Sequence, residues 1–410
     1  MNQKNMVTAK KTIFSKNFSK KNINLKEKPK YLKNIPSLRF KEYKDEWKLQ
    51  KLGDISSITT GSKNLKDNDP DGKYPFYVRS KNIEHINSYS YDGEAILIPG
   101  DGKIGKILHY VNGKFDYHQR VYKISDFKNV EGKFIYYYLQ KNFLHHALKH
   151  SLKATVDSLR LPVIKEMKIY FPTLDEQKRI VSLLSKIDTK ISLMEQKYNV
   201  IKKSKKIILQ QLYPENISEV ESKIFQDKWD VKKLDEIAEI GDGIHKTPNY
   251  VKNGIKFISV KDIHDFSKTT KFIKKEEYDK YKMKTQKNDI FLTRVGTVGK
   301  SNILKENEDY AYYVNISLIR ADEKINPDYL NQYIKTDSFQ RELCKRTLYN
   351  TMPIINIKDL KQCLVVFPIM EDQIKIGNLL VIFDEKLRLN QKQIELMKKF
   401  KSNLLQKMLV

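Results

Sequence analysis

The sequence predicts an α+β fold in which two similar globular α/β domains are separated by two long antiparallel coiled-coil helices, related by a pseudo-twofold internal repeat. Three observations carry this prediction. The globular part occurs twice, each copy is followed by a stretch with heptad spacing of apolar residues, and the connection between the copies favours antiparallel helices.

The internal repeat is visible in short segments that recur in the same order. Its last segment is Phe-Pro followed, after four residues, by Gln, and from Phe171 and Phe367 onward the distance between the copies is constant. Insertions therefore fall in the globular part, and helix length is the constrained quantity. The matched segments are Trp47–Ile55 with Trp229–Ile237, Gly61 with Gly243, Phe76–Ile83 with Phe257–Ile263, Ile96–Lys106 with Ile290–Lys300, and Phe171–Gln177 with Phe367–Gln373.

The repeat divides the chain into five segments. Residues 1–34 hold ten lysines and one acid, and we expect them to form a disordered basic arm. The other four are expected to be domain 1 at 35–173, helix 1 at 174–213, domain 2 at 214–369 and helix 2 at 370–410.

The two helical segments carry the pattern of a coiled-coil seam. Thr173 and Glu176 form a capping-box pattern at the start of helix 1, after Pro172. Apolar residues then alternate at four and three positions, which is typical of a coiled coil, and Lys205 and Lys401 interrupt the stripe at equivalent places. The predicted seam includes Ile180, Leu184, Ile187 and Ile191 in helix 1, and Ile376, Leu380, Phe383 and Leu387 in helix 2.

The connection between the helices indicates their orientation. A helix of about 38 residues is roughly 57 Å long, and one compact domain must join the end of helix 1 to the start of helix 2. Antiparallel pairing brings those two points together, and it also brings residues near 35 close to residue 410. We therefore expect the domains to lie at opposite ends of one rod, which would act as a ruler.

The charge of the chain indicates a polyanionic partner. There are 77 Lys and Arg against 50 Asp and Glu, a formal net charge of +27, and double-stranded DNA is the usual partner of such a chain. The two cysteines, Cys344 and Cys363, lack the spacing of a disulfide framework or a metal site, which fits a cytoplasmic protein. No apolar run approaches the length of a membrane span.

Fragments that resemble catalytic motifs are incomplete. Gly296-Thr-Val-Gly299-Lys300 lacks the first glycine of a P-loop because that position is Arg294. Asn326-Pro327-Asp328-Tyr329 lacks the second proline of an adenine methyltransferase loop, and more simply opens a helix. His146 and His150 stand one helical turn apart without the glutamate of a zinc protease. We expect no catalytic residue, no metal and no cofactor in this chain.

The polar loops have the composition of a DNA-reading surface. Lysines and backbone amides can hold phosphates, while Asn, Gln and Arg can make bidentate contacts to bases. These loops differ between the two copies although the frame around them repeats, so two different base sequences would be read. The candidate residues are Lys63, Asn64, Arg79, Lys81, Asn82, Lys103, Lys106, Gln119, Arg120 and Lys153 in domain 1, and Lys246, Thr247, Lys261, Arg294, Thr297, Lys300, Asn315 and Asn350 in domain 2.

Together these segments resemble the specificity subunit of type I restriction–modification systems. The resemblance rests on Ile35–Phe40, Trp47–Leu52, the Gly-x-x-Gly-Lys loops and the Phe-Pro-x-x-x-x-Gln segments, and it spans about residues 35–410. It implies two target-recognition domains, each reading one half of a split, asymmetric DNA site, with the spacer set by the helices. It also implies that adenine methylation and ATP-dependent cleavage belong to partners, namely two methyltransferase subunits and the restriction–translocase subunits, which bind S-adenosylmethionine and ATP.

Two other classes of protein remain open at this point. One is a bivalent DNA-binding or architectural protein without enzymatic partners, which would not co-purify with a methyltransferase. The other is a fused methyltransferase–nuclease, which would methylate DNA as an isolated chain.

Overall fold

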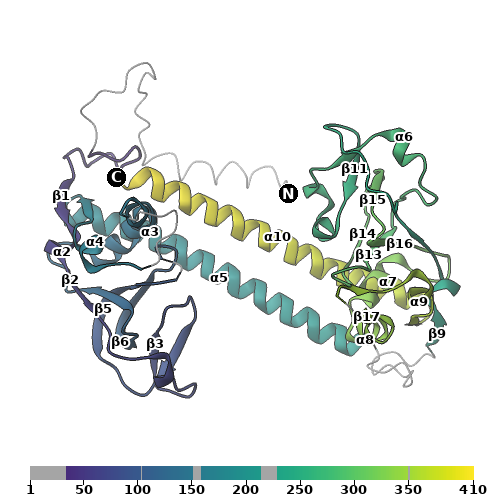
Figure 1. Ribbon diagram of the computed structural model, residues 1–410, viewed down its shortest axis with the longest axis horizontal. Coiled ribbons are helices and arrows are strands. Elements are labelled where there is room, and N and C mark those ends of the chain that lie inside the picture. The colour runs from purple at the N-terminus through teal and green to yellow at the C-terminus, as the bar shows by residue number, and fades with distance from the viewer. Residues whose placement is uncertain (1–33, 103, 151–157, 214–228, 350) are drawn as a thin grey trace, which may run out of the picture. The chain divides into compact units, whose positions relative to one another are not determined.

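The computed structural model describes residues 34–102, 104–150, 158–213, 229–349 and 351–410, and they form two compact units. Unit 1 runs to Leu193 and takes in Gln393–Val410, and unit 2 is Met194–Lys392. The unit boundaries therefore fall inside the two long helices, α5 (Leu174–Leu212) and α10 (Met370–Met408), each 39 residues long (Figure 1). Each unit holds one globular domain, the first half of the helix that follows it and the last part of the other helix.

Unit 1 is built on a six-stranded sheet. Its strands are antiparallel except for the parallel pair β3–β6. In spatial order they are β2 (Ser57–Thr60), β7 (Val121–Ser125), β5 (Tyr91–Pro99), β6 (His109–Tyr117), β3 (Tyr74–Tyr77) and β4 (Ile83–Ile86). A separate antiparallel pair, β1 (Lys48–Lys51) with β8 (Lys168–Phe171), leads into α5, and the helical elements are α2 (Leu52–Ile55), η1 (Leu65–Asp67), α3 (Gly132–Lys149) and α4 (Leu161–Lys165).

Unit 2 repeats this topology with the strands divided between two sheets. One sheet has the order β10 (Ala238–Asp242), β16 (Ile316–Ala321), β13 (Ile290–Thr293), β14 (Ser301–Ile303), and a second has the order β12 (Phe272–Ile273), β11 (Ile255–Ile258), β15 (Tyr310–Tyr312). Two further pairs are β9 (Asp230–Lys233) with β19 (Leu364–Phe367) and β17 (Leu348–Tyr349) with β18 (Pro353–Ile354). The helical elements are η2 (Leu234–Glu236), η3 (Val260–Asp262), η4 (Phe266–Lys268), α6 (Lys275–Tyr278), α7 (Pro327–Ile334), α8 (Asp337–Arg346) and α9 (Ile357–Lys361).

The two sheets of unit 2 correspond to the single sheet of unit 1. The long strand β6 joins both halves of the unit 1 sheet, and in unit 2 its place is taken by β14 and β15. The parallel pair β3–β6 matches the parallel pair β11–β15. The matched glycines mark the same close approach, because a Cβ on Gly61 would lie 1.9 Å from the Tyr117 carbonyl oxygen and one on Gly243 would lie 2.2 Å from that of Tyr312.

The repeated glutamine fastens the start of each long helix to its own domain. The buried Gln177 side chain donates to the Pro172 carbonyl and accepts from the Glu131 amide, at the start of α3. Gln373 makes the same two hydrogen bonds, with Pro368 and with Asn326, the N-cap of α7. The predicted helix opening at Asn326-Pro327 is thereby confirmed, since the Asn326 side chain accepts from the Tyr329 amide at 3.0 Å.

The start of α5 carries one contact that the sequence did not predict. Glu176, expected as half of a capping box with Thr173, instead accepts two hydrogen bonds of 2.7 Å from the Arg39 guanidinium. The segment around Arg39 also contacts the end of α10, because the Leu38 amide donates to the Lys407 carbonyl at 2.8 Å. Chain positions near 35 and near 410 thus lie together, as antiparallel pairing requires.

Within each unit the helix segments pack antiparallel around a lysine that interrupts the apolar stripe. In unit 1, Lys401 of α10 pairs with Asp188 of α5 at 2.7 Å, and Asp188 also accepts from the Tyr137 hydroxyl of α3. In unit 2, Lys205 of α5 pairs with Asp384 of α10, and Asp384 also accepts from Gln332 of α7. The two lysines that interrupt the apolar stripes therefore form equivalent ion pairs.

The apolar seam is buried most deeply where the helices meet the domain cores. The four α5 positions, together with Ile376 and Leu380 of α10, are buried, whereas Phe383 and Leu387 are half-buried. Ile180 and Leu184 share one hydrophobic cluster with Leu404 and Met408.

None of the helices in the described ranges combines the length and the hydropathy that a membrane-spanning segment needs.

Candidate nucleic-acid interface

The first group of predicted contact residues comes from three loops that meet beside the Gly-x-x-Gly loop of unit 1. The Gln119 side chain donates to the Asn64 side chain at 2.6 Å, and the Gln119 amide donates to the Lys63 carbonyl. Arg79 and Arg120 each donate to one oxygen of Asp101, at 3.1 and 3.3 Å. The structure thus gathers five of the predicted residues into one polar surface, which we call surface 1 (Lys63, Asn64, Arg79, Gln119 and Arg120).

The remaining predicted residues of unit 1 lie near surface 1 in sequence or outside the described residues. Lys81 and Asn82 are exposed after Arg79, in a turn where Ser80 donates to the Asn82 carbonyl. Lys106 is exposed at the end of the Gly-x-x-Gly loop. Lys103 and Lys153 lie outside the described residues.

In unit 2 the predicted residues are less tightly grouped. Lys246 and Thr247 are exposed directly after His245, which pairs with Asp242 at 2.8 Å. The Arg294 amide donates to the Asn315 carbonyl, and Thr297 and Lys300 are exposed on the loop that follows. We call the exposed and half-buried members of this group surface 2 (Lys246, Thr247, Thr297, Lys300 and Asn315), and the buried Arg294 is not part of it. Lys261 is exposed on the separate turn η3, and Asn350 lies outside the described residues.

Arg294 differs from the other predicted contact residues because its side chain is only 7 % exposed. Its guanidinium reaches the Asp242 carboxylate and the Ile355 carbonyl, both at 3.4 Å, and its Nε has no partner. Burial, which outweighs the attraction of Asp242, lowers the pKa of Arg294 below its usual value. In this conformation Arg294 braces the loop from inside and does not face solvent.

The glycines of the two Gly-x-x-Gly loops have similar φ angles in both units. Gly102 and Gly105 have φ of 76° and 70°, and Gly296 and Gly299 have φ of 79° and 89°, a region that glycine adopts without strain. The second glycine of each pair packs against a helix, since a Cβ on Gly105 would meet the Leu144 backbone at 2.8 Å. The loop is therefore a repeated support that presents Lys106 or Lys300 to solvent.

Sequence reasoning missed the residues that organise these surfaces. Asp101 and Asp242 hold the arginines, and neither carries a pattern of its own in the sequence. Burial, followed by the nearby charge of Arg79, lowers the pKa of His118, and its Nδ1 accepts the Arg120 amide at 2.9 Å. A neutral His118 thus fixes the turn that carries Gln119 and Arg120.

Within the described ranges, no group of three or more His, Cys, Asp or Glu side chains could hold a metal ion. Cys344 is exposed and Cys363 is buried, and burial raises the pKa of the Cys363 thiol to about 12. A thiol with so high a pKa is not a nucleophile at neutral pH.

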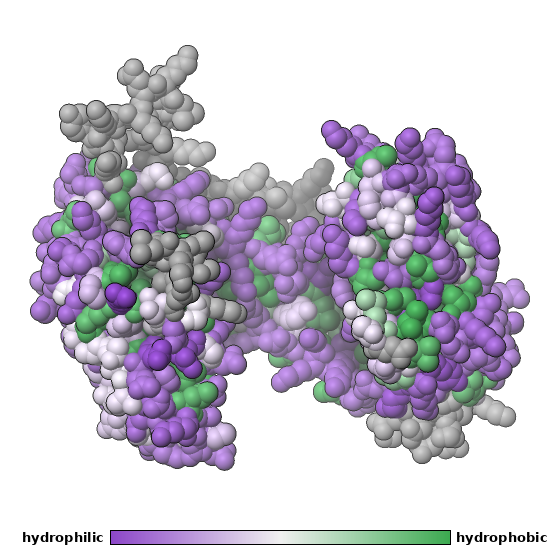
Figure 2. Space-filling model, viewed as in Figure 1, coloured by the Kyte–Doolittle hydropathy of each residue, from purple (hydrophilic) through white to green (hydrophobic). Residues whose placement is uncertain are grey.

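Hydrophilic residues cover most of the visible face of both units (Figure 2).

Comparisons with known proteins agree with this architecture. Two segments, residues 44–203 and 226–399, match the family described as the type I restriction modification DNA specificity domain. The MjaVIII specificity subunit of Methanocaldococcus jannaschii is 25% identical over 409 residues, covering 92% of this chain and 95% of that protein.

Two solved structures share the fold. The S subunit of the type I restriction–modification system from M. genitalium matches with a TM-score of 0.69 and 16% identity, over 92% of this chain and 99% of that one. A second structure, which concerns complex assembly and conformational transition of the type I R-M system, matches with a TM-score of 0.52 and 15% identity, over 89% of this chain and 98% of that one.

The family matches twice, once in each copy of the internal repeat, and together the two matches cover most of the chain. The MjaVIII protein named above and the EcoBI protein of Escherichia coli are specificity subunits of type I restriction enzymes. The chain belongs to the family of type I restriction–modification DNA specificity domains and carries two copies of that domain.

Proposed function

We propose that this chain is the subunit that reads a bipartite, asymmetric DNA site, and that it directs adenine methylation and ATP-dependent cleavage by partner subunits. The observation that carries this proposal is the contrast between a repeated frame and dissimilar loops. Equivalent glycine loops support both surfaces, yet the places of Gln119 and Arg120 in unit 1 are taken by Val314 and Asn315 in unit 2. Different side chains on one frame suit two different half-sites.

The charge and exposure of surface 1 support direct contact with DNA. Arg79 and Arg120 are 48 and 63 % exposed, while the Asp101 that aligns them is 16 % exposed. An aligned, accessible guanidinium can make the bidentate contact that distinguishes guanine in the major groove. Lys63 is half-buried, Lys81 and Lys106 are exposed, and all three are suited to phosphate contacts.

The helices support a role in setting the distance between the half-sites. Both are 39 residues long, which corresponds to about 58 Å of α-helix. Each begins with the same glutamine hydrogen bonds, made by Gln177 or Gln373. The two helices are joined by equivalent lysine–aspartate pairs. A rigid spacer of fixed length would present two half-sites at a fixed separation.

Exposed apolar stripes on both helices support the docking of partner subunits. Residues repeating every heptad are between 45 and 62 % exposed, which is unusual for large apolar side chains on an isolated chain: Leu193, Val200 and Ile207 on α5, and Ile382, Leu389 and Leu396 on α10. Leu193 and Val200 are equivalent to Leu389 and Leu396 in the repeat. Two equivalent stripes suit two copies of one methyltransferase subunit.

Mapping of methylated adenines across the genome, with and without the gene, tests the proposal. We expect one split motif with two unlike halves to be methylated only when the chain is present. Replacing residues 35–173 with the same domain of a related subunit should change one half of the motif and keep the other. An unchanged methylation pattern after deletion, together with no co-purified methyltransferase, would instead indicate a DNA-binding protein without enzymatic partners.

A further inference from the structure

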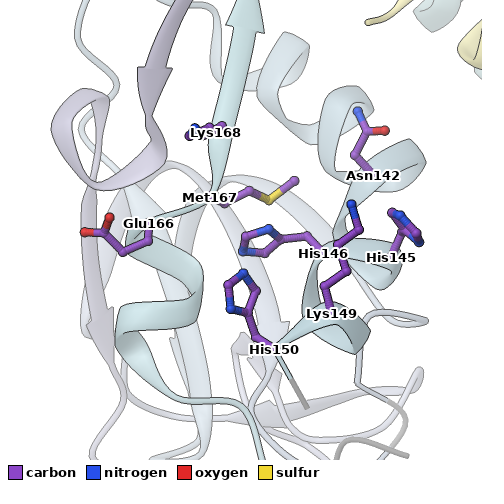
Figure 3. A pocket seen from close by; sticks show the side chains of 8 residues that line it. All are labelled: Asn142, His145, His146, Lys149, His150, Glu166, Met167 and Lys168. Carbon is purple, nitrogen blue, oxygen red and sulfur yellow. The ribbon is translucent and has the colours of Figure 1, made fainter. Parts of the chain in front are cut away.

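A basic cavity of about 470 Å³ lies at the C-terminal end of α3 in unit 1. Four of its lining residues come from that helix (Asn142, His145, His146 and Lys149), His150 follows as the helix C-cap, and the opposite wall includes Met167 and Lys168. Figure 3 shows His146 and His150 side by side, with ring centroids 4.7 Å apart.

Among the residues that the structure describes, no carboxylate of the cavity wall faces the histidines. The nearest carboxylate in its wall, Glu166, points away from the histidines in Figure 3 and pairs with Lys51 at 2.6 Å. The Nε2–H of His146 donates to the Val163 carbonyl at 2.7 Å, because a carbonyl oxygen can only accept. Burial, opposed by this hydrogen bond, lowers the pKa of His146.

The second copy of the repeat shows what is missing from this cavity. The constant sequence offset between the two copies aligns α4 with α9 and β8 with β19. The same offset aligns His146 with Glu342, Lys149 with Lys345, and His150 with Arg346. In unit 2 the Glu342 side chain is only 6 % exposed, and it pairs with both Lys345 and Arg346. A buried carboxylate therefore neutralises the cluster in unit 2, whereas unit 1 has an imidazole in the same place.

The cavity lies on the other side of α3 from the loop assigned to DNA. Gly105 of the Gly-x-x-Gly loop packs on Leu144. With 3.6 residues per turn, Leu144 and His146 point about 200° apart around the helix axis. A duplex held by surface 1 and the glycine loop would not enter this cavity, which favours an occupant other than the DNA being read.

We propose that the cavity at the end of α3 is a binding site for a carboxylate-bearing segment of a partner polypeptide, whose Glu or Asp side chain takes the place that Glu342 occupies in unit 2. The ligand class is an acidic peptide, because the internal equivalent is a carboxylate and the cavity is larger than a single ion needs. Lys149, Lys168 and the His150 ring would contact it. This site is separate from the DNA surfaces and goes beyond the proposed function.

Fluorescence anisotropy with a labelled hexaglutamate peptide and the full chain tests this proposal. We expect His146→Glu, which supplies the carboxylate internally, to weaken peptide binding at least about tenfold, the loss expected for a charge-assisted contact. His146→Gln keeps the residue neutral and adds no carboxylate, so it should bind nearly as the unchanged chain does. Thr270→Glu, at an exposed position of unit 2, is the control for the change in net charge and should bind as the unchanged chain does.

The outcomes are distinguishable from failure of the proposed function. Sequence-specific binding to the mapped DNA motif should persist in His146→Glu, because the cavity lies away from surface 1. Equal peptide affinity in His146→Glu and Thr270→Glu would show that the general basic surface binds the peptide, and would overturn the proposal. Loss of duplex binding in His146→Glu would also overturn it, since the cavity would then take phosphates.

Discussion

Asp101 is not itself part of surface 1, but it holds two of that surface's residues in place. One of its oxygens accepts from Arg79 and from Arg120, which come from different loops. Such a shared acceptor fixes the directions of both guanidinium groups before any ligand arrives. Preorganisation of this kind lowers the entropy cost of forming base contacts.

The first prediction concerns Arg120. We expect Arg120→Ala to relax the base preference at one position of the half-site read by unit 1, at a cost of about 1–3 kcal/mol in binding to the preferred base. The other half-site should be unaffected. Anisotropy titrations with duplexes that carry single-base changes in each half-site measure both effects.

Lys114→Ala provides the control for Arg120→Ala, because Lys114 is an exposed cation that lies over the Tyr89 ring and is not part of surface 1. It should leave the base preference unchanged. An equal loss of affinity for every duplex in Arg120→Ala would mean that Arg120 contacts phosphate and not a base.

The second prediction concerns the protonation of Asp384. Burial by itself raises the pKa of this carboxyl, but Lys335 and Lys205, together with hydrogen bonds from Lys205 and Gln332, lower it overall. A carboxyl whose pKa is lower in the folded state stabilises the fold above its unfolded pKa of about 3.9, and this contribution disappears as pH falls through the folded pKa. The difference in unfolding free energy between the natural chain and Asp384→Asn should therefore shrink between about pH 5 and pH 3. A difference that stays constant over this range in urea titrations would contradict the assignment.

Lys205 and Lys401, which interrupt the apolar stripes of the two long helices, take part in equivalent three-way contacts. Each lysine joins the end of one long helix to the start of the other, and the aspartate is held from the domain side by Tyr137 or Gln332. Lys205 follows Asp188 at the same sequence distance as Lys401 follows Asp384. One antiparallel register therefore satisfies both pairs, and polar groups in an apolar seam are known to specify register.

The third prediction concerns this contact. Lys205→Met leaves Asp384 without its interhelical partner, and we expect a loss of about 1–3 kcal/mol in unfolding free energy, the range for a hydrogen bond to a charged group. Lys206→Met, at an exposed position of the same helix, should change the stability by less than about 0.5 kcal/mol.

The double variant Lys205→Met with Asp384→Leu should recover part of the loss, because it removes the carboxylate that has lost Lys205. Recovery should be incomplete, since Lys335 also pairs with Asp384 and loses that partner. Urea denaturation measures all three variants. A double variant less stable than Lys205→Met would show that the pair stabilises the fold beyond what apolar packing supplies.

The fourth prediction separates the two glycines of the unit 1 loop. Gly105→Ala should destabilise the domain more than Gly102→Ala, because its Cβ would meet the Leu144 backbone at 2.8 Å, while a Cβ on Gly102 meets nothing within 4 Å. Gly102→Ala should cost only the strain of a positive φ, about 1–3 kcal/mol. Thermal unfolding measures the order, and equal losses would mean that packing on α3 contributes nothing.

The sequence predicts the elements whose physics is local. Heptad spacing specifies the two helices, and Asn326-Pro327 specifies the start of α7. The parallel strand pairs β3–β6 and β11–β15 depend on contacts between segments that are distant in the sequence, and no sequence pattern predicts them. The same limit applies to Asp101, since its role depends on where the loops of Arg79 and Arg120 meet.

Burial of Arg294 shows a second limit. Its sequence context, a polar loop with glycines, is that of an exposed DNA contact, but the loop folds back so that the carbonyl of Ile355 and the carboxylate of Asp242 enclose the guanidinium. Composition predicts which residues could contact DNA, and only the tertiary structure decides which side chains face outward.

In the whole molecule, the differing side chains and the features of fixed length belong to different parts of the repeat. The domains carry the differing side chains, and the paired helices carry the equal lengths and equivalent ion pairs. The boundary between the two units falls inside both helices, after Leu193 and after Lys392. Residues inserted there would leave the contacts of each unit intact.

The most direct measurement of the central claim is the methylated motif of a chain with one heptad inserted after Leu193 and another after Lys392. Seven residues lengthen an α-helix by about 10.5 Å, which is about three base pairs of DNA. We expect methylome sequencing to find the same two half-site sequences with a spacer longer by about three base pairs. Altered half-site bases with an unchanged spacer would contradict the account.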